Sequence, residues 1–96
     1  MRTKGTTGNQ NVFRDLGFSE AEAANLRIRA EMMNALIAHI EKKRWTQAQA
    51  ARHLRMTQPR VSNLMRGKIQ LFSIDTLVNL LAAAGRRVDF RVGKAA

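Results

Sequence analysis

The sequence predicts a mainly α-helical domain of four to five helices, followed by one short β-strand near the C-terminus. Three observations support this fold class. Apolar residues recur at intervals of three and four through most of the chain, which is the spacing of one helix face. Four residues suited to an N-cap stand directly before such stretches, namely Ser19, Thr46, Thr57 and Ser73. After residue 85 the interval changes to two, which is the period of a strand.

The N-terminal third is expected to hold a tail and one long helix. Residues 1–11 are rich in Thr, Gly, Asn and Gln and have no periodicity, so they are expected to be flexible. Residues 12–18 form a short apolar patch. A helix should begin after Ser19, because Glu22 completes a Ser-x-x-Glu capping box. Its apolar residues keep the helical spacing to about Arg44, which predicts one long amphipathic helix.

Residues 46–68 contain two short helices at the interval of a helix-turn-helix. The first begins after Thr46, and Trp45 just before it is expected to pack over this helix. The second begins after Thr57 and ends at Gly67. In such a unit the second helix faces outward and can enter the major groove of DNA.

The C-terminal part predicts one more helix and a strand. The helix should begin after Ser73 and end at Gly85. Beyond it the apolar residues Val88, Phe90 and Val92 alternate with charged ones, which indicates a half-buried strand. Because a lone strand has bare edges, we expect it to pair with its copy in a homodimer or to lend an edge to a partner protein. These three residues are the dimerisation candidates.

These elements divide the chain of 96 residues into three parts. Residues 1–11 are the flexible tail. Residues 12–85 are the helical DNA-binding domain, with its motif at 46–68. Residues 86–96 are the C-terminal strand and tail, which we expect to contact a second subunit or a partner.

The net charge of +10 is concentrated on the helix-turn-helix. Residues 41–70 hold eight basic side chains and a single acidic one, Glu41. Lys and Arg placed near phosphates release condensed counterions and so raise the affinity for a polyanion. We therefore expect double-stranded DNA as the partner. The alternative is a charged surface that only keeps the protein soluble.

Other classes of site find little support in the composition. The chain has no Cys, and His39 and His53 have few carboxylates near them, so no metal site is expected. His39 is expected to pack on a helix flank and His53 to lie on the basic face. Ser62 has no base–acid partners for nucleophilic catalysis, and no Gly-rich phosphate loop is present, so we expect neither an enzyme nor a cofactor. No apolar run has membrane-spanning length and no signal peptide is evident, which favours a soluble cytoplasmic protein.

A helical wheel sorts the residues of the second motif helix by role. Val61 and Leu64 share one face and should dock against the body of the domain. Residues on the opposite face and its flanks are the candidates for reading bases: Gln58, Pro59, Arg60, Ser62 and Asn63. Residues near the helix starts and just beyond the second helix are the candidates for phosphate contacts: Gln47, Thr57, Arg66 and Lys68. Arg60 can reach either guanine or a phosphate, and any of these side chains can simply face solvent.

Residues 46–68 also resemble the helix-turn-helix of the Cro/phage-repressor (XRE) family. In that family Thr-Gln begins the first helix, and Thr-Gln-x-x-Val-Ser-x-Leu-x-Arg-Gly-Lys forms the second. The upstream segments NVFRDLGF (11–18), EAEAANL (20–26) and RAEMM (29–33) are similar to HigA-like antitoxins of type II toxin–antitoxin modules. Together the resemblance covers about residues 11–92.

The resemblance implies a lambda-repressor-like fold and a specific role. Such a protein would bind its own operator as a dimer, repress its operon and neutralise a RelE/HigB-like ribonuclease toxin. A stand-alone XRE-type repressor and a nonspecific DNA- or RNA-binding protein remain the alternatives. One position departs from the family: the turn residue that is often Gly is Arg55 here, so the turn must form without the residue best suited to a positive φ.

Overall fold

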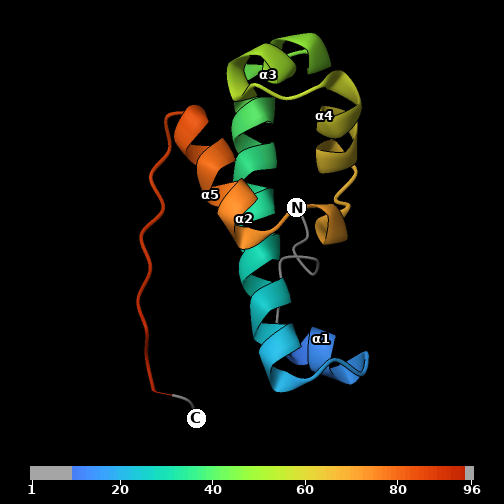
Figure 1. The fold of residues 1–96 in the computed structure, drawn as a ribbon, viewed down its shortest axis with the longest axis vertical. Coiled ribbons are helices and arrows are strands. Elements are labelled where there is room, and N and C mark those ends of the chain that lie inside the picture. Colours follow the sequence, from blue (N-terminus) through green and yellow to red (C-terminus); the bar gives the residue numbers. More distant parts are fainter. Residues whose placement is uncertain (1–9, 95–96) are drawn as a thin grey trace.

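A computed structural model describes residues 10–94, and this part of the chain is helical without strands (Figure 1). Five α-helices and one short 3₁₀-helix follow one another along it: α1 (Gln10–Asp15), α2 (Glu20–Lys43), α3 (Gln47–Leu54), α4 (Gln58–Met65), η2 (Ile69–Leu71) and α5 (Ile74–Ala83). The predicted mainly α fold class is confirmed.

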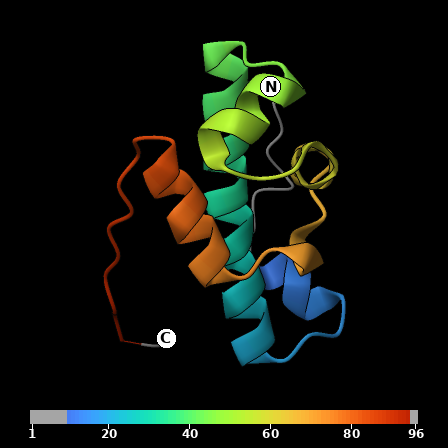
Figure 2. The same cartoon turned by 45° about the horizontal axis from the view of Figure 1, so that its top comes forward.

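The long helix α2 is the axis on which the other helices are arranged (Figure 1). α1 lies at its N-terminal end, and α3 lies at its C-terminal end. Figures 1 and 2 both place α5 on one side of α2 and α4 on the other. The helix-turn-helix and α1 are therefore at opposite ends of the molecule.

The start and end of α2 follow from local hydrogen bonds. The Ser19 hydroxyl accepts from the Glu22 N–H at 3.1 Å, and the Glu22 carboxylate accepts from the Ser19 N–H at 2.9 Å. This is the predicted capping box, and its backbone hydrogen bond lowers the pKa of Glu22. The helix ends at Lys43, and Arg44 then adopts a left-handed conformation with φ 58°.

The core joins α2, α3, α4 and α5 into one apolar cluster. Its largest fully buried side chains are Phe72, Leu36, Leu64, Leu77 and Val61. The predicted docking face of α4, formed by Val61 and Leu64, is therefore confirmed. Phe72, which directly follows η2, is fully buried although it lies in a connection between helices.

The predicted C-terminal strand is wrong for the single chain. Residues 86–94 contain no strand, and Phe90 and Val92 are 87% and 84% exposed, whereas Val88 packs against the core. Ladder hydrogen bonds require a neighbouring strand, and the remainder of the described chain is built from helices and short connections. Figure 1 shows these residues as an extended segment on the α5 side of α2.

The predicted N-terminal tail is described only in part. Residues 1–9 lie outside the described residues. Gln10 and Asn11, which were assigned to the tail, begin α1 instead. This helix is held to α2 by an ion pair of 2.7 Å between Arg14 and Glu20, whose hydrogen bond lowers the pKa of Glu20. Within the described residues, no helix combines the length and the apolar character that a membrane crossing requires.

Candidate nucleic-acid interface

The first helix of the motif, α3, is fixed at both ends by its own sequence. The Thr46 hydroxyl accepts from the Gln49 N–H at 3.1 Å, and the Gln49 side chain accepts from the Thr46 N–H at 2.9 Å. These two bonds form a second capping box, and the predicted start of this helix after Thr46 is confirmed. After Leu54 the turn residue Arg55 has φ 57°, and its N–H donates to the Ala51 carbonyl. A non-Gly residue in this conformation costs about 1 kcal/mol, so the turn forms in spite of Arg55 rather than because of it.

The second helix, α4, is capped by Thr57 and seated by two buried residues. The Thr57 hydroxyl accepts from the Arg60 N–H at 3.3 Å, and Pro59 stands in the first turn, where no N–H is needed. Val61 and Leu64 are both 0% exposed. Their burial fixes the rotation of α4 about its own axis, so the opposite face is turned to solvent.

The base-reading candidates divide by exposure. Gln58 and Pro59 are exposed, whereas Ser62 and Asn63 are half-buried. The Asn63 side-chain oxygen accepts a hydrogen bond from the Arg66 guanidinium at 3.3 Å. This contact links a base-reading candidate to a phosphate candidate and restricts the orientation of both side chains.

The Arg60 guanidinium has partners outside α4, in the segment around η2. It donates to the Leu71 carbonyl at 3.1 Å and lies 4.3 Å from the centre of the Phe72 ring. Arg60 thereby ties α4 to the segment around η2. Sequence reasoning missed this contact, because Leu71 is eleven residues away and no local pattern connects the two.

The phosphate candidates are all exposed. Gln47 is the first residue of α3 and Thr57 is the N-cap of α4, so both lie at helix starts, where free N–H groups favour anions. Arg66 caps the end of α4. Lys68 follows Gly67, whose φ of 71° turns the chain away from the helix axis. The structure thus distributes these four residues around both helices of the motif.

An aromatic cluster closes the junction between α2 and α3. Trp45 stacks on His53 with ring centres 4.2 Å apart, and it meets His39 edge to face at 5.4 Å. The predicted packing of Trp45 on the following helix is confirmed, as is the flank packing of His39. Burial, followed by the nearby charges of Lys43 and Arg86, lowers the pKa of His39.

The basic character around the motif continues into neighbouring elements. The last turn of α2 contributes Lys42 and Lys43, and Arg44 follows as its cap. Arg52 and Arg55 lie at the end of α3 and in the turn, and both are exposed. Ion pairs occur elsewhere in the described chain, between Arg14 and Glu20, Arg27 and Glu31, and Arg87 and Asp89. Among residues 10–94, none of the basic side chains of the motif forms an ion pair, so their charge is available to an anionic partner. Among the described residues, no group of three or more His, Asp or Glu side chains is arranged to hold a metal ion.

Comparisons with known proteins agree with this geometry. A family model described as a helix-turn-helix domain matches residues 12–93. A solved structure whose name reads in part "XRE Family Transcriptional Regulator" is similar, with a TM-score of 0.72 and 34% sequence identity. The match covers 77% of this chain and 83% of that one. No curated protein matches the chain.

Proposed function

Since the chain belongs to the helix-turn-helix domain family and is of the XRE type, we propose that it is a transcriptional regulator recognising a specific sequence in double-stranded DNA. One observation carries this proposal: α4 is seated by fully buried Val61 and Leu64 and turns a polar face to solvent. In helix-turn-helix proteins such a helix lies in the major groove. We propose no enzymatic activity and no cofactor.

We propose that Gln58, Pro59, Ser62 and Asn63 read bases. Gln and Asn can donate to and accept from adenine at once, and Pro can contact a thymine methyl group. Asn63 is the central reader, because its contact with Arg66 orients its amide before DNA arrives. Arg60 is expected to stabilise the position of α4 rather than to read bases, because its guanidinium already contacts Leu71 and Phe72.

Four other residues are proposed to grip the DNA backbone without reading sequence. Gln47 and Thr57 offer side-chain and N–H donors at the two helix starts. Arg66 and Lys68 supply positive charge at and beyond the end of α4. Each cationic contact adds one released counterion, so these two residues should contribute to affinity for any duplex.

We propose that the protein acts as a homodimer. One helix-turn-helix reads only a few base pairs, and a genome contains many chance copies of so short a site. The exposed Phe90 and Val92 support a contact through residues 86–94, because such apolar side chains are usually covered in a functional assembly. A two-fold dimer would bind two half-sites about 34 Å apart, or one turn of the duplex.

We further propose that this regulator is an antitoxin that represses its own operon and neutralises a RelE/HigB-like toxin. It rests on the resemblance of residues 11–33 to HigA-like antitoxins. These residues form α1 and the first half of α2, at the end of the molecule away from the motif (Figure 1). A partner bound there would leave the recognition helix free. A stand-alone XRE-type repressor is the alternative. An adjacent reading frame that encodes a small basic RelE-like chain would separate the two.

Selection from a pool of random duplexes tests the proposed function. The protein is incubated with the pool at physiological salt, and the bound DNA is amplified and sequenced over several rounds. We expect an inverted repeat with half-site centres about one helical turn apart. Recovery of no enriched motif, together with equal affinity for random duplex and RNA, would instead support a nonspecific nucleic-acid-binding protein.

A further inference from the structure

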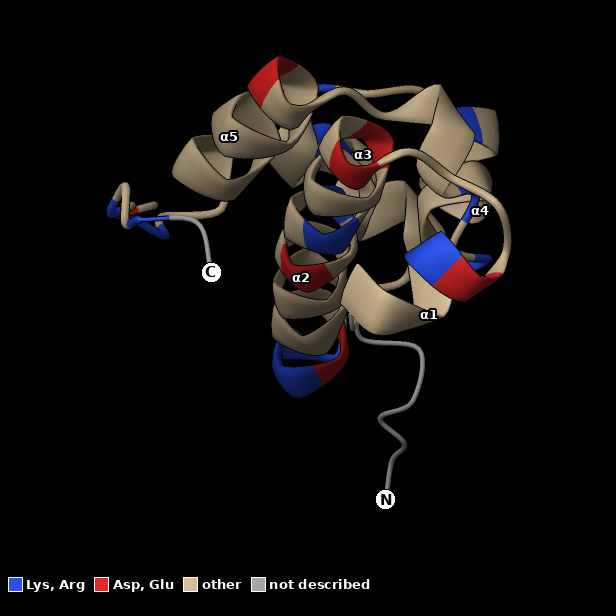
Figure 3. Ribbon diagram, turned by 90° about the horizontal axis from the view of Figure 1, so that it is seen from below, with Lys and Arg blue, Asp and Glu red and all other residues tan. Residues whose placement is uncertain are grey.

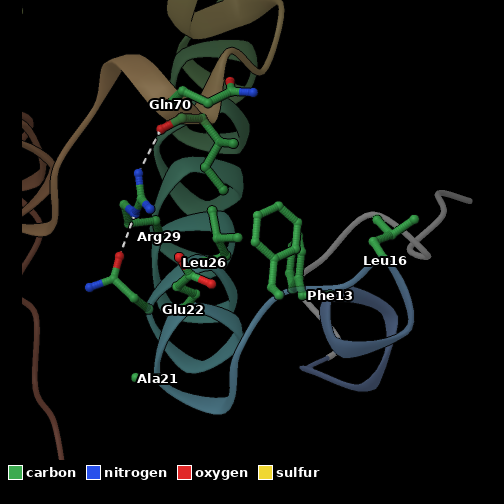
Figure 4. A pocket seen from close by; sticks show the side chains of 10 residues that line it. Phe13, Leu16, Ala21, Glu22, Leu26, Arg29 and Gln70 are labelled. Atoms are coloured by element: carbon green, nitrogen blue, oxygen red, sulfur yellow. Dashed lines mark hydrogen bonds between the residues drawn. The ribbon is translucent and has the colours of Figure 1, made fainter.

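An apolar hollow of about 760 Å³ lies between α1, the first turns of α2 and η2 (Figure 4). Its apolar lining comes from all three elements and the α1–α2 connection: Phe13, Leu16, Phe18, Leu26 and Ile69. Leu16 is 70% exposed and Phe18 is 41% exposed. In a chain of this size an exposed apolar surface with a concave shape indicates a contact site.

Hydrogen bonds and an aromatic contact hold the residues that line the hollow in place. Arg29 donates to the Asn25 side chain at 2.7 Å and to the Ile69 carbonyl at 3.1 Å, and these bonds hold η2 against α2 (Figure 4). On the other side, the rings of Phe13 and Phe18 meet edge to face with centres 6.4 Å apart. The hollow is therefore preformed in the single chain.

Residues 86–94 form an exposed segment with large apolar side chains, on the α5 side of α2. In residues 86–94, Phe90 and Val92 are 87% and 84% exposed, the highest values among the large apolar residues of the described chain. Val88 anchors the start of this segment on the core. The exposed side chains therefore extend from a fixed point.

The region around the hollow and the segment carry net charges of opposite sign. Residues 10–25, which form α1 and the start of α2, hold three acidic side chains and one basic one, in a chain of net charge +10. Residues 86–94 hold four basic side chains and one acidic one. In Figure 3 basic and acidic segments adjoin on α1, whereas the C-terminal segment is mainly basic. Both surfaces are apolar, and the region around the hollow differs from the segment in the sign of its net charge, while the charged residues that line the hollow itself are Glu22 and Arg29.

The segment does not fill the hollow of its own chain. Its last described residues, Gly93 and Lys94, line a different hollow, together with Gln10, Asn11 and Arg14 of α1. Those residues are on the polar side of α1, whereas Phe13 and Leu16 face the hollow. Within residues 10–94 the segment therefore leaves the hollow of its own chain open to a second molecule.

We propose that the hollow receives residues 86–94 of a second copy of this chain, with Phe90 as the anchor. Two copies exchange segments reciprocally, so each hollow is filled and each segment is covered by the same two-fold contact. Glu22 at the rim then faces the basic side chains of the incoming segment. This inference rests on the proposed homodimer and identifies the surface that receives the segment. Because the antitoxin proposal places a toxin on the same residues, a second copy and a toxin would compete for this surface.

The test uses two variants and their mixture. Phe90→Asp changes the segment and Leu16→Asp changes the hollow, and both side chains are exposed, so each variant should fold. Ile28→Asp is the matched control, because Ile28 is also an exposed apolar residue but does not line the hollow. Circular dichroism melts verify the fold, and sedimentation equilibrium gives the dimer dissociation constant.

Loss of one buried aromatic contact weakens association about 30-fold, so each variant homodimer, which loses two contacts, should be weakened about 1000-fold. The mixture of Phe90→Asp and Leu16→Asp chains regains one intact contact. Its heterodimer should therefore be about 30-fold tighter than either variant homodimer. Ile28→Asp should dimerise like the unchanged protein.

Other outcomes would overturn the inference in distinguishable ways. If Phe90→Asp weakens the dimer while Leu16→Asp leaves it unchanged, the segments pair with each other and the hollow is not their receptor. If the unchanged chain is a monomer at tens of micromolar, or if neither variant alters a dimer that does form, the proposed dimer contact itself is wrong.

Discussion

Replacing Arg60 by Ala should destabilise the folded domain by about 2 kcal/mol, although Arg60 lies on the proposed DNA-binding helix. The substitution removes the hydrogen bond of 3.1 Å to the Leu71 carbonyl and the contact of 4.3 Å with the Phe72 ring. A hydrogen bond from a half-exposed charged donor contributes about 1 to 1.5 kcal/mol. A cation–π contact at such a site adds about 0.5 to 1 kcal/mol.

Urea unfolding followed by circular dichroism measures this effect, and the thermal midpoint should fall by about 10 °C. Arg52→Ala is the control, because it removes an exposed Arg from the motif for which the structure gives no such contacts. A second comparison isolates the ring contact. In a Phe72→Leu background, Arg60→Ala should cost about 0.5 to 1 kcal/mol less than in the unchanged protein.

A contradictory result would be an Arg60→Ala protein that is as stable as Arg52→Ala but has lost its preference for the operator over random duplex. That pattern would mean that the guanidinium leaves Leu71 and Phe72 to contact DNA. A loss of stability with an unchanged preference would support the role of Arg60 as a brace behind the helix.

Three further predictions follow from the turn, the junction and the end of the motif. Arg55→Gly should stabilise the domain by about 0.5 to 1 kcal/mol in urea unfolding, because φ at this residue is 57°; Arg52→Gly, inside α3, should be destabilising by about 1 kcal/mol. His39 has a folded-state pKa below its ordinary value of 6.5, so the unfolded chain binds the proton more tightly and stability should fall as the pH drops through 6.5 toward the folded-state pKa. His39→Gln should lack this part of the pH dependence when urea midpoints are compared at pH 7.5 and below, and an equal slope in both proteins would contradict the assignment. Lys68→Ala should weaken binding to all duplexes alike and make the slope of log K against log salt shallower by about 1, whereas a loss confined to the operator would mean that Lys68 reads sequence.

The helix starts could be predicted from the sequence because their causes are local. Ser19 and Thr46 each form a capping box with the residue three positions on, so a short window contains both partners. Thr57 and Ser73 also cap as expected. Helix spacing likewise revealed Leu64 as a core residue, since the period of a helix decides which side chains share a face.

The failures came from features that depend on distant partners. Alternation at Val88, Phe90 and Val92 describes the period of a strand, but a strand also needs a neighbour to complete its hydrogen bonds, and one chain supplies none among its described residues. α1 was missed in part because its six residues are too few for a periodic pattern, and its position depends on the pair between Arg14 and Glu20. The contacts of Arg60 with Leu71 and Phe72 were missed for the same reason, because these partners are distant in the sequence.

The candidate site was predictable in its location but not in its internal contacts. The N-cap residues predict where the motif helices begin, and the helical spacing of apolar residues predicts which residues of the motif are buried. The hydrogen bond between Asn63 and Arg66 and the brace at Arg60 depend on side-chain conformations that sequence spacing does not determine. Binding measurements on variants of Gln58, Pro59, Ser62 and Asn63 will assign the role of each residue.

The most direct test of the central claim is the ratio of operator affinity to random-duplex affinity for the unchanged protein, Asn63→Ala and Gln58→Ala. The operator comes from the selection experiment, and both duplexes are titrated at two or more salt concentrations. If α4 reads bases, each substitution should lower operator affinity by about 1 to 3 kcal/mol and leave random-duplex affinity nearly unchanged. A ratio for Asn63→Ala equal to that of the unchanged protein, at every salt concentration, would contradict the assignment of α4 as the recognition helix.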